Sequence, residues 1–198
     1  AASIYKLPLA MLYYDKVNDG EYTLDSTFTY SGYMHEDAGV INSNYGIGSQ
    51  IPLSDLLDDL IEYSDNDAGH ILYENLGGWK EYKEAMTKYT DFISENYYTE
   101  DNVSTANTMN DVVTYLYEHK EDYKDLIENM EKAEPGEYLD RDTQLSMPQK
   151  YGMYDSALNS VGFVECNTSY SIVVLTDLGN KGADVMANIN RIAYEHFK

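Results

Sequence analysis

The sequence predicts an α+β fold, in which an antiparallel sheet is flanked by helices and joined to a helical subdomain. Helical periodicity dominates from about residue 54 to residue 132, whereas 147–176 holds short runs rich in Val, Tyr and Phe between turn residues. Helices and strands are thus segregated along the chain, which favours an antiparallel sheet. With 198 residues, 43% of them hydrophobic, the chain is expected to form one domain over 1–198.

The helices are indicated by apolar spacing and by start and stop residues. The first ends at the breaker Asn18-Asp19-Gly20, and Ser54 is the predicted N-cap of the second. Glycines without a sustained period predict loops around a functional surface over 22–50. In chain order, the predicted helices cover 3–17, 54–64, 68–76 and 79–88, with helix dominating from there to residue 132.

The last third of the chain should supply the sheet and one more helix. Three runs, 147–153, 157–166 and 170–176, read as antiparallel strands. After Gly179-Asn180, apolar residues recur at helical spacing, which predicts a final amphipathic helix within the C-terminal region 147–197.

Composition excludes several classes of partner. Against 35 acidic residues there are 13 basic ones, and the net charge of -22 opposes binding to nucleic acid. The single cysteine, Cys166, excludes an internal disulfide and thiolate-rich metal sites, and the histidines, His35 among them, show no metal-ligand spacing. We expect no metal, no cofactor and a monomer.

The first candidate for chemistry is Ser3-Ile4-Tyr5-Lys6, an SxxK pattern. On a helix, this spacing brings the hydroxyl and the amine to one face, within reach of a hydrogen bond. A lysine so placed can accept the serine proton if its own pKa is lowered. Two further patterns follow in the chain, Ser64-Asp65-Asn66 and Lys150-Tyr151-Gly152, the latter at the head of a predicted strand.

Taken in this order, the three patterns resemble the catalytic motifs SxxK, SDN and KTG of class A β-lactamases and penicillin-binding proteins. The flanking residues are similar too, including Leu76-Gly77-Gly78 after the second motif and Tyr154-Asp155 after the third. The resemblance spans nearly the whole chain. It implies a serine hydrolase that forms an acyl-enzyme with a small-molecule β-lactam or a D-alanyl peptide, outside the cytoplasmic membrane.

The resemblance also implies roles for individual residues. Ser3 is the nucleophile, Lys6 its base, and Ser64 relays a proton toward the leaving nitrogen. Asn66 binds the amide of the substrate's acyl side chain, and Lys150 adds positive electrostatic potential to the site. Tyr151, Gly152 and Met153 border the substrate, and the backbone N–H groups of Ser3 and Met153 form the oxyanion hole.

Three departures from the family pattern leave alternatives open. Tyr151 stands where the family has Thr or Ser, whose hydroxyl helps hold the substrate carboxylate. The deacylating glutamate has no clear counterpart, and Glu100 is the candidate. The helix and strands that precede the nucleophile in the family have no counterpart in this chain. The alternatives to a β-lactamase are a D,D-peptidase-like penicillin-binding protein with slow deacylation and a non-catalytic ligand-binding homologue.

Overall fold

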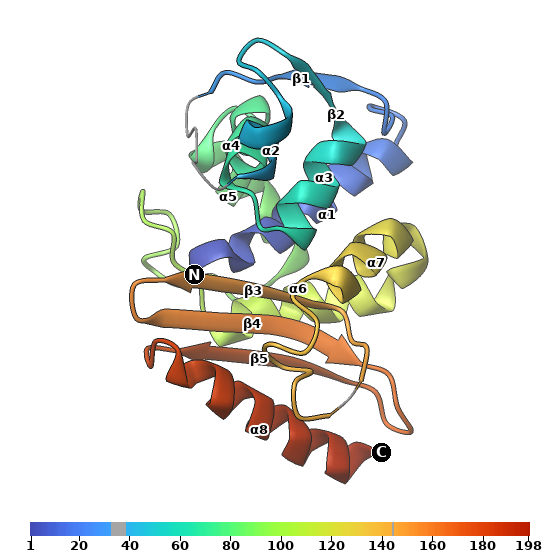
Figure 1. The fold of residues 1–198 in the computed structure, drawn as a ribbon, viewed down its shortest axis with the longest axis vertical. Helices are drawn as coiled ribbons and strands as arrows, with labels where there is room; N and C mark the ends of the chain where they lie inside the picture. Colours follow the sequence, from blue (N-terminus) through green and yellow to red (C-terminus); the bar gives the residue numbers. More distant parts are fainter. Residues whose placement is uncertain (33–38, 144) are drawn as a thin grey trace.

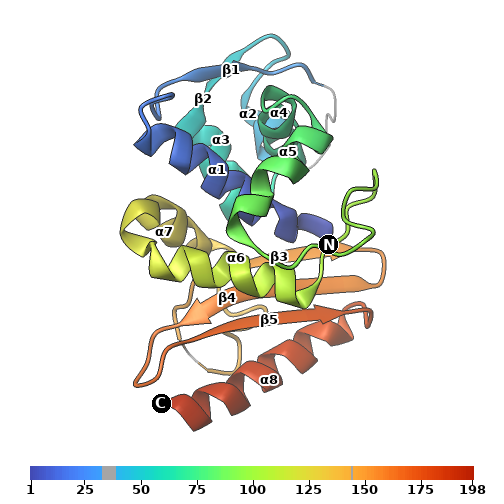
Figure 2. The same ribbon diagram turned by 180° about the vertical axis from the view of Figure 1, so that it is seen from behind.

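The computed structural model describes residues 1–32, 39–143 and 145–198, and its C-terminal part is a three-stranded sheet between helices (Figure 1). The strands β3 (Gln149–Tyr154), β4 (Ala157–Val164) and β5 (Tyr170–Thr176) pair antiparallel in that order. Helix α8 (Lys181–Phe197) covers one face, and α6 (Ala106–Glu118) packs on the other (Figures 1 and 2).

Side chains alternate between the two faces of the sheet, and each face packs against a core of its own. Val161 and Phe163 of β4 face the core shared with the helical region, whereas Leu158 and Val164 face a second core against α8. Both faces of β4 are therefore covered, and every residue after Ala157 is buried, including the polar Asn159 and Ser160.

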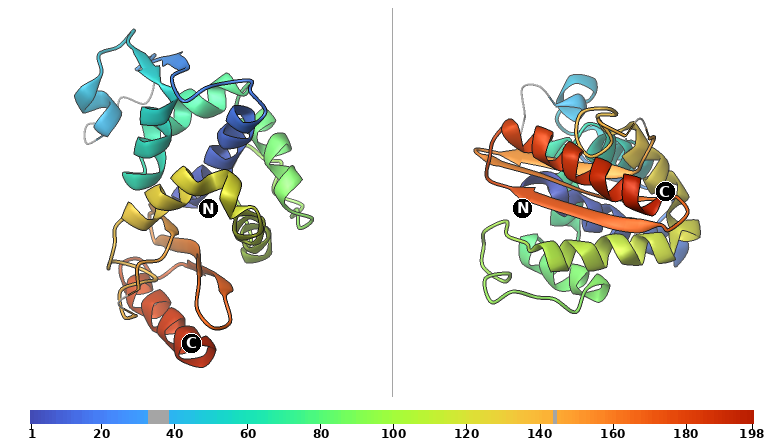
Figure 3. Two further views of the ribbon diagram at one scale, coloured as in Figure 1. Left: turned by 90° about the vertical axis from the view of Figure 1, so that its right-hand side faces the viewer. Right: turned by 90° about the horizontal axis from the view of Figure 1, so that it is seen from below.

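The helical region is built around α1 (Lys6–Asn18). The helix buries all of its first nine residues, as expected of a helix that is surrounded by others. The elements that surround it are α3 (Leu53–Glu62), α4 (Asn66–Asn75), α5 (Trp79–Met86) and the 3-10 turn η3 (Lys120–Tyr123), whereas α7 (Lys124–Lys132) packs on α3. Figure 3 shows these helices as a body above the sheet, with the first turn of the chain at the boundary between them.

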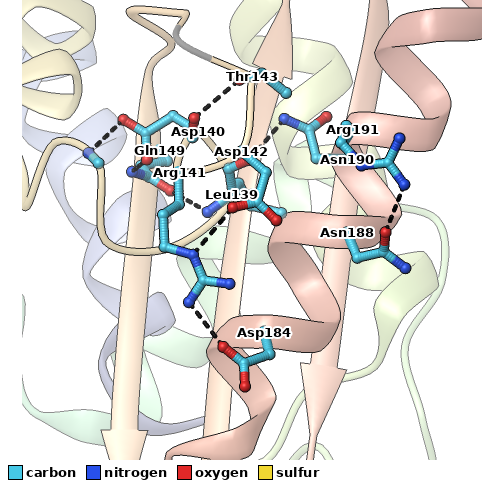
Figure 4. Close-up of polar contacts among 11 residues, drawn as sticks. Leu139, Asp140, Arg141, Asp142, Thr143, Gln149, Asp184, Asn188, Asn190 and Arg191 are labelled. Carbon is cyan, nitrogen blue, oxygen red and sulfur yellow. Dashed lines mark hydrogen bonds and ion pairs between the residues drawn. The ribbon is translucent and has the colours of Figure 1, made fainter.

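The segment between α7 and β3 is fixed by a buried polar network (Figure 4). The Gln149 side-chain amide donates to Asp140 at 2.8 Å and accepts from the Leu139 N–H at 3.0 Å. Asn190 of α8 donates to the Leu139 carbonyl at 2.8 Å, and Arg141 pairs with Asp184 at 3.0 Å. The network ties the entry of β3 to α8, and so fixes the strand that carries the third motif.

The α+β architecture, the three antiparallel strands and the final helix are confirmed. Short helices and strands occur within the predicted loop region 22–50. Residues 33–38 of this region, including His35, lie outside the described residues. Strand β1 (Thr27–Thr29) pairs with β2 (Gln50–Pro52) so that Phe28 and Ile51 are buried together, and α2 (Val40–Asn44) lies between them.

Three local predictions are wrong. The chain begins with a 3-10 turn, η1 (Ala2–Tyr5), before α1. Ser54 does not cap α3, which begins one residue earlier after Pro52; the extended backbone of Pro52 already sets the helix start. Residues 90–105 form a loop rather than helix. A further short helix is η2 (Thr87–Tyr89).

One buried carboxyl in α3 makes stability depend on pH. Burial, then repulsion from Asp65 and Asp55, raises the pKa of Asp59 from 3.8 to about 7. The folded state therefore retains a proton that the unfolded chain releases, and the resulting stability is lost as pH rises through about 7.

We expect Asp59→Asn to stabilise the protein at pH 8 by on the order of 1 to 3 kcal/mol, with the gain shrinking as the pH is lowered to 5. Denaturant unfolding at both pH values measures this. Asp25→Asn, at an exposed position, removes the same charge and should change stability little. An equal gain at both pH values would contradict the prediction.

Candidate functional site

The SxxK pattern lies at the boundary between η1 and α1. In a 3-10 turn, side chains three residues apart eclipse each other, so Ser3 and Lys6 are directed to the same side. Ala2, just before Ser3, has a φ of 51°, in the left-handed region that non-glycine residues seldom adopt. Its carbonyl accepts from the Asn102 side chain at 2.9 Å, which holds this unusual turn in place.

The Lys6 ammonium is completely buried and bonded to the second motif. Its Nζ lies 2.5 Å from the Ser64 carbonyl oxygen, 2.6 Å from Asn66 Oδ1 and 3.3 Å from Ser64 Oγ. Ser64 adopts a φ of 57°, in the left-handed region. The sequence-predicted residues Lys6, Ser64 and Asn66 are therefore brought together across 58 positions or more of the chain.

The middle residue of the second motif positions the motif itself. Asp65 is the N-cap of α4: its Oδ1 accepts from the Ala68 N–H at 2.9 Å and its Oδ2 from the Ile41 N–H at 3.1 Å. A capping carboxylate of this kind stabilises the helix start. Asp65 thus fixes the turn from which Ser64 and Asn66 reach Lys6.

Glycine is required on α4 beside the motif. A Cβ at Gly69 would lie 2.6 Å from the Tyr5 hydroxyl and 3.4 Å from Lys6 Cε. The absence of a side chain lets Tyr5 and Lys6 pass close to the helix.

The third motif brings a second fully buried lysine to the site. Burial, and then the nearby Lys6, lowers the pKa of Lys150 well below its ordinary value. Lys150 Nζ donates to the Tyr151 carbonyl at 2.8 Å and lies 4.2 Å from the centre of the Tyr151 ring. Two desolvated amines therefore face the site from opposite elements, α1 and β3.

Gly152 allows η1 to approach β3 at backbone distance. A Cβ at Gly152 would lie 2.5 Å from the Ser3 nitrogen and 2.8 Å from the Ile4 nitrogen, so no side chain fits at this position. Met153 follows at the same edge, and with Ser3 it lines a cleft. Binding a developing oxyanion requires two backbone N–H groups directed into one cleft, and the two residues predicted to supply them both line this one.

The cleft has a volume of about 540 Å³ and lies between η1, the end of β3 and the loop before α6. Its lining residues are Ala1, Ala2, Ser3, Tyr5, Asn66, Glu100, Asp101, Asn102, Met153, Tyr154 and Ala157. Ser3, Asn66, Met153 and Glu100 therefore share one cavity. Among the described residues, Lys6, Ser64 and Lys150 do not line it.

Tyr151 takes a different position. Its ring stacks on Tyr138 at 4.8 Å between centres, and burial, then Glu134, raises its pKa to about 12. In the part of the chain that the structure describes, Tyr151 does not line the Ser3 cleft.

Glu100 lines the cleft but is exposed. Among the described residues, no hydrogen bond or ion pair joins its carboxylate to Ser3 or Lys6. Glu100 therefore lines the Ser3 cleft, but it lacks the direct contact with Ser3 or Lys6 that would identify it as a base.

The loop that carries Glu100 is organised by a residue that the sequence analysis missed. Lys83 of α5 is 2% exposed, and its Nζ donates to the carbonyls of Tyr97, Thr99 and Asp101 at 2.7, 2.7 and 2.5 Å. Burial lowers the pKa of Lys83, and Asp101 acts in the opposite direction.

Aromatic rings complete the environment of Lys83. Its Nζ lies 5.3 Å from the ring centres of both Trp79 and Tyr97. The spacing of Trp79 and Lys83, four residues apart on a helix, is the one sequence signal that could have indicated it.

Asn102 was likewise missed, as was Asn159, whose amide donates to the Ala1 carbonyl at 3.1 Å. Both asparagines hold the segment that leads into Ser3.

Within the described residues, no group of three or more His, Cys, Asp and Glu side chains is arranged to hold a metal ion. In that same part of the chain, no helix has the length and apolar character needed to cross a membrane.

Solved structures with the same fold are penicillin-recognising proteins. One is PBP-A, in an L158E mutant solved as an acyl-enzyme complex with penicillin G. It has 17% sequence identity to this chain and a TM-score of 0.84, and the match covers 100% of this chain and 81% of PBP-A. A β-lactamase from Sphaerobacter thermophilus has 21% identity and a TM-score of 0.80 over 100% of this chain and 82% of its own. One from Chitinophaga pinensis has 21% identity and a TM-score of 0.79, covering 100% and 85%. No curated protein sequence matched.

The fold is therefore that shared by class A β-lactamases and penicillin-binding proteins. The sequence model of the β-lactamase enzyme family matches residues 1–197, and the chain belongs to that family.

Replacing Lys83 should loosen the loop without unfolding the protein. Lys83→Met removes three hydrogen bonds from a charged donor, so we expect faster amide hydrogen exchange in 97–102 and a loss of stability of about 2 kcal/mol. Lys80→Met is the matched control, because Lys80 lies on the same helix, is 77% exposed and pairs only weakly with Glu84. Equal exchange rates in the two variants would contradict the role assigned to Lys83.

Proposed function

We propose that the protein is a serine hydrolase that forms an acyl-enzyme at Ser3 and opens the amide bond of a β-lactam. The observation that carries this proposal is the buried Lys6 ammonium, bonded to Ser64 and Asn66, beside the cleft that Ser3 lines. A lysine held in this way can exchange protons with both hydroxyls of the site.

In the proposed reaction, the Lys6 ammonium first releases a proton, and Ser3 Oγ then attacks the carbonyl carbon while its own proton passes to Lys6 Nζ. The N–H groups of Ser3 and Met153 stabilise the oxyanion. As the tetrahedral intermediate collapses, the carbon–nitrogen bond breaks, and Ser64 passes a proton from Lys6 to the leaving nitrogen. The product is an ester at Ser3, and Asn66 binds the amide of the acyl side chain.

Lys150 is proposed to attract the substrate carboxylate. Since its pKa is lowered by burial and by Lys6, an arriving carboxylate would favour the protonated form, and binding would be coupled to proton uptake. Tyr151, stacked on Tyr138, is not proposed to supply the hydroxyl that the family uses here.

Hydrolysis of the ester needs an activated water, for which Glu100 is the proposed base. Its exposed position and its lack of contact with Lys6 in the described chain favour slow turnover over rapid turnover. A D,D-peptidase-like protein with a persistent acyl-enzyme is therefore the second candidate. For either activity, the proposed site of action is outside the cytoplasmic membrane, as is typical of the family.

Time-resolved intact-mass spectrometry with benzylpenicillin tests the proposal in wild type and in Ser3→Ala. We expect a covalent adduct in wild type and none in Ser3→Ala, and a rate of adduct formation at least about 100-fold lower in Lys6→Met, because base catalysis contributes on that scale. An adduct that decays as penicilloate accumulates indicates a β-lactamase, and one that persists indicates a penicillin-binding protein.

Lys181→Met serves as the control for loss of a lysine outside the site, because Lys181 is exposed at the start of α8. Reversible binding of the drug to wild type without any adduct would favour the non-catalytic homologue and overturn the proposal.

A further inference from the structure

We propose that Tyr151 is a positioning residue whose aromatic ring, rather than its hydroxyl, holds the Lys150 ammonium; the consequence for catalysis rests on the proposed function. At this position of the third motif the family has Thr or Ser, which cannot make such a contact. A phenol ring binds a cation through the negative face of its π system. Tyr151 follows Lys150 directly in β3.

Lys150 is the buried lysine that has the fewest oxygen partners in the described part of the chain. A protonated lysine has three N–H donors. Lys6 contacts three oxygen atoms of the second motif, and Lys83 donates to three carbonyls. Among the described residues, Lys150 has one acceptor, the Tyr151 carbonyl at 2.8 Å. Its completely buried ammonium therefore needs a further partner.

The Tyr151 ring is that partner. Lys150 Nζ lies over the ring, 4.2 Å from its centre. The other contacts between lysines and aromatic rings in the described chain are longer, from 5.1 to 5.8 Å. A cation–π contact is strongest where the cation is removed from water, as it is here. The shortest contact of this kind thus belongs to the buried lysine with the fewest oxygen partners.

The ring itself is held in place by its surroundings. It stacks on Tyr138, with 4.8 Å between the ring centres and an angle of 21° between the ring planes. The segment that carries Tyr138 is tied to the start of β3, because the Gln149 side chain donates to Asp140 at 2.8 Å (Figure 4). The ring of Tyr151 is therefore positioned beside Lys150 without any ligand.

Two charged groups act on Lys150 in addition to the ring. Lys6, from α1, repels a charge on Lys150, and Glu134, from the segment after α7, attracts it. The Tyr151 phenol stays neutral near pH 7, because burial, and then Glu134, raises its pKa to about 12. The ring therefore favours a charged Lys150 without adding a negative charge to the site.

This property suits a lysine that is proposed to attract a carboxylate. An acidic side chain in the position of Tyr151 would also stabilise the Lys150 ammonium, but it would repel the carboxylate of the substrate. A neutral ring stabilises the same ammonium and leaves its positive charge available to the substrate.

An NMR titration of the Lys150 ε-carbon, in the full chain without substrate, tests the contact. Tyr151→Leu removes the ring, so we expect the midpoint of the Lys150 titration to fall by about one pH unit, the size expected of a desolvated cation–π contact. Tyr151→Phe keeps the ring and should retain the wild-type midpoint. Tyr138→Leu removes only the stacking partner and should lower the midpoint by less. Tyr154→Leu is the matched control, because Tyr154 ends the same strand and is 75% exposed.

Acylation by benzylpenicillin and by its methyl ester, which lacks the negative charge, tests the consequence for the proposed reaction. At a pH above the Lys150 midpoint, Tyr151→Leu should slow acylation by benzylpenicillin about tenfold, because the protonated fraction of Lys150 falls by that factor when the midpoint falls by one pH unit. Acylation by the ester should change little, and Tyr151→Phe should restore the rate with benzylpenicillin.

The outcomes separate this inference from the proposed function. A Lys150 midpoint that stays or rises in Tyr151→Leu, or that falls equally in Tyr151→Phe, would overturn the inference and leave the proposed function standing. Equal slowing of benzylpenicillin and its ester would also overturn it, since the ring would then act on the turn at Ser3 rather than on the Lys150 charge. If Tyr151→Leu does not fold, the midpoints in Tyr138→Leu and Tyr151→Phe decide. Absence of any adduct in wild type would overturn the proposed function, whereas the titration would still decide whether the ring holds Lys150.

Discussion

The burial of two lysine amines, one at the start of α1 and one in β3, is the constraint on which the rest of the structure depends. Lys6 and Lys150 are both inaccessible to solvent, and holding either in its charged form there costs several kcal/mol. Lys6 recovers part of this through three oxygen atoms of the second motif, and the apolar core around α1 must offset the remainder. Ser64 in a left-handed conformation and Gly152 without a side chain are consequences of this arrangement.

The sequence could predict the features that depend on local pattern. Amphipathic spacing identified the helices, and strand composition identified β5 with its bounds. The order of the three motifs predicted that Lys6, Ser64 and Asn66 would meet, because the chemistry requires those residue types together. The 3-10 turn at Ser3 was missed because its apolar spacing is compatible with an α-helix, and tertiary contacts with β3 decide between them.

Other parts of the site depend on contacts that no local pattern encodes. No periodic pattern in residues 90–105 predicts the path of this loop. The path is fixed by Lys83, from a helix earlier in the chain, which donates hydrogen bonds to three carbonyls of the loop. The motif predicts that Tyr151 contacts the substrate, yet its ring stacks on Tyr138. The segment that carries Tyr138 is held in place by hydrogen bonds of Asp140, Gln149 and Asn190. Both cases show backbone or ring positions fixed by residues that lie far away in the sequence.

The account depends most on the desolvated amine of Lys150, and an NMR titration of lysine ε-carbons measures it directly. We predict a resonance that titrates well below 10.5 and that disappears in Lys150→Met, while the resonance of Lys83, whose pKa is also lowered, and those of the exposed lysines remain. The contrary result is a Lys150 resonance that titrates at its ordinary value, which would mean that water reaches the ammonium and that the site is not built around buried lysines.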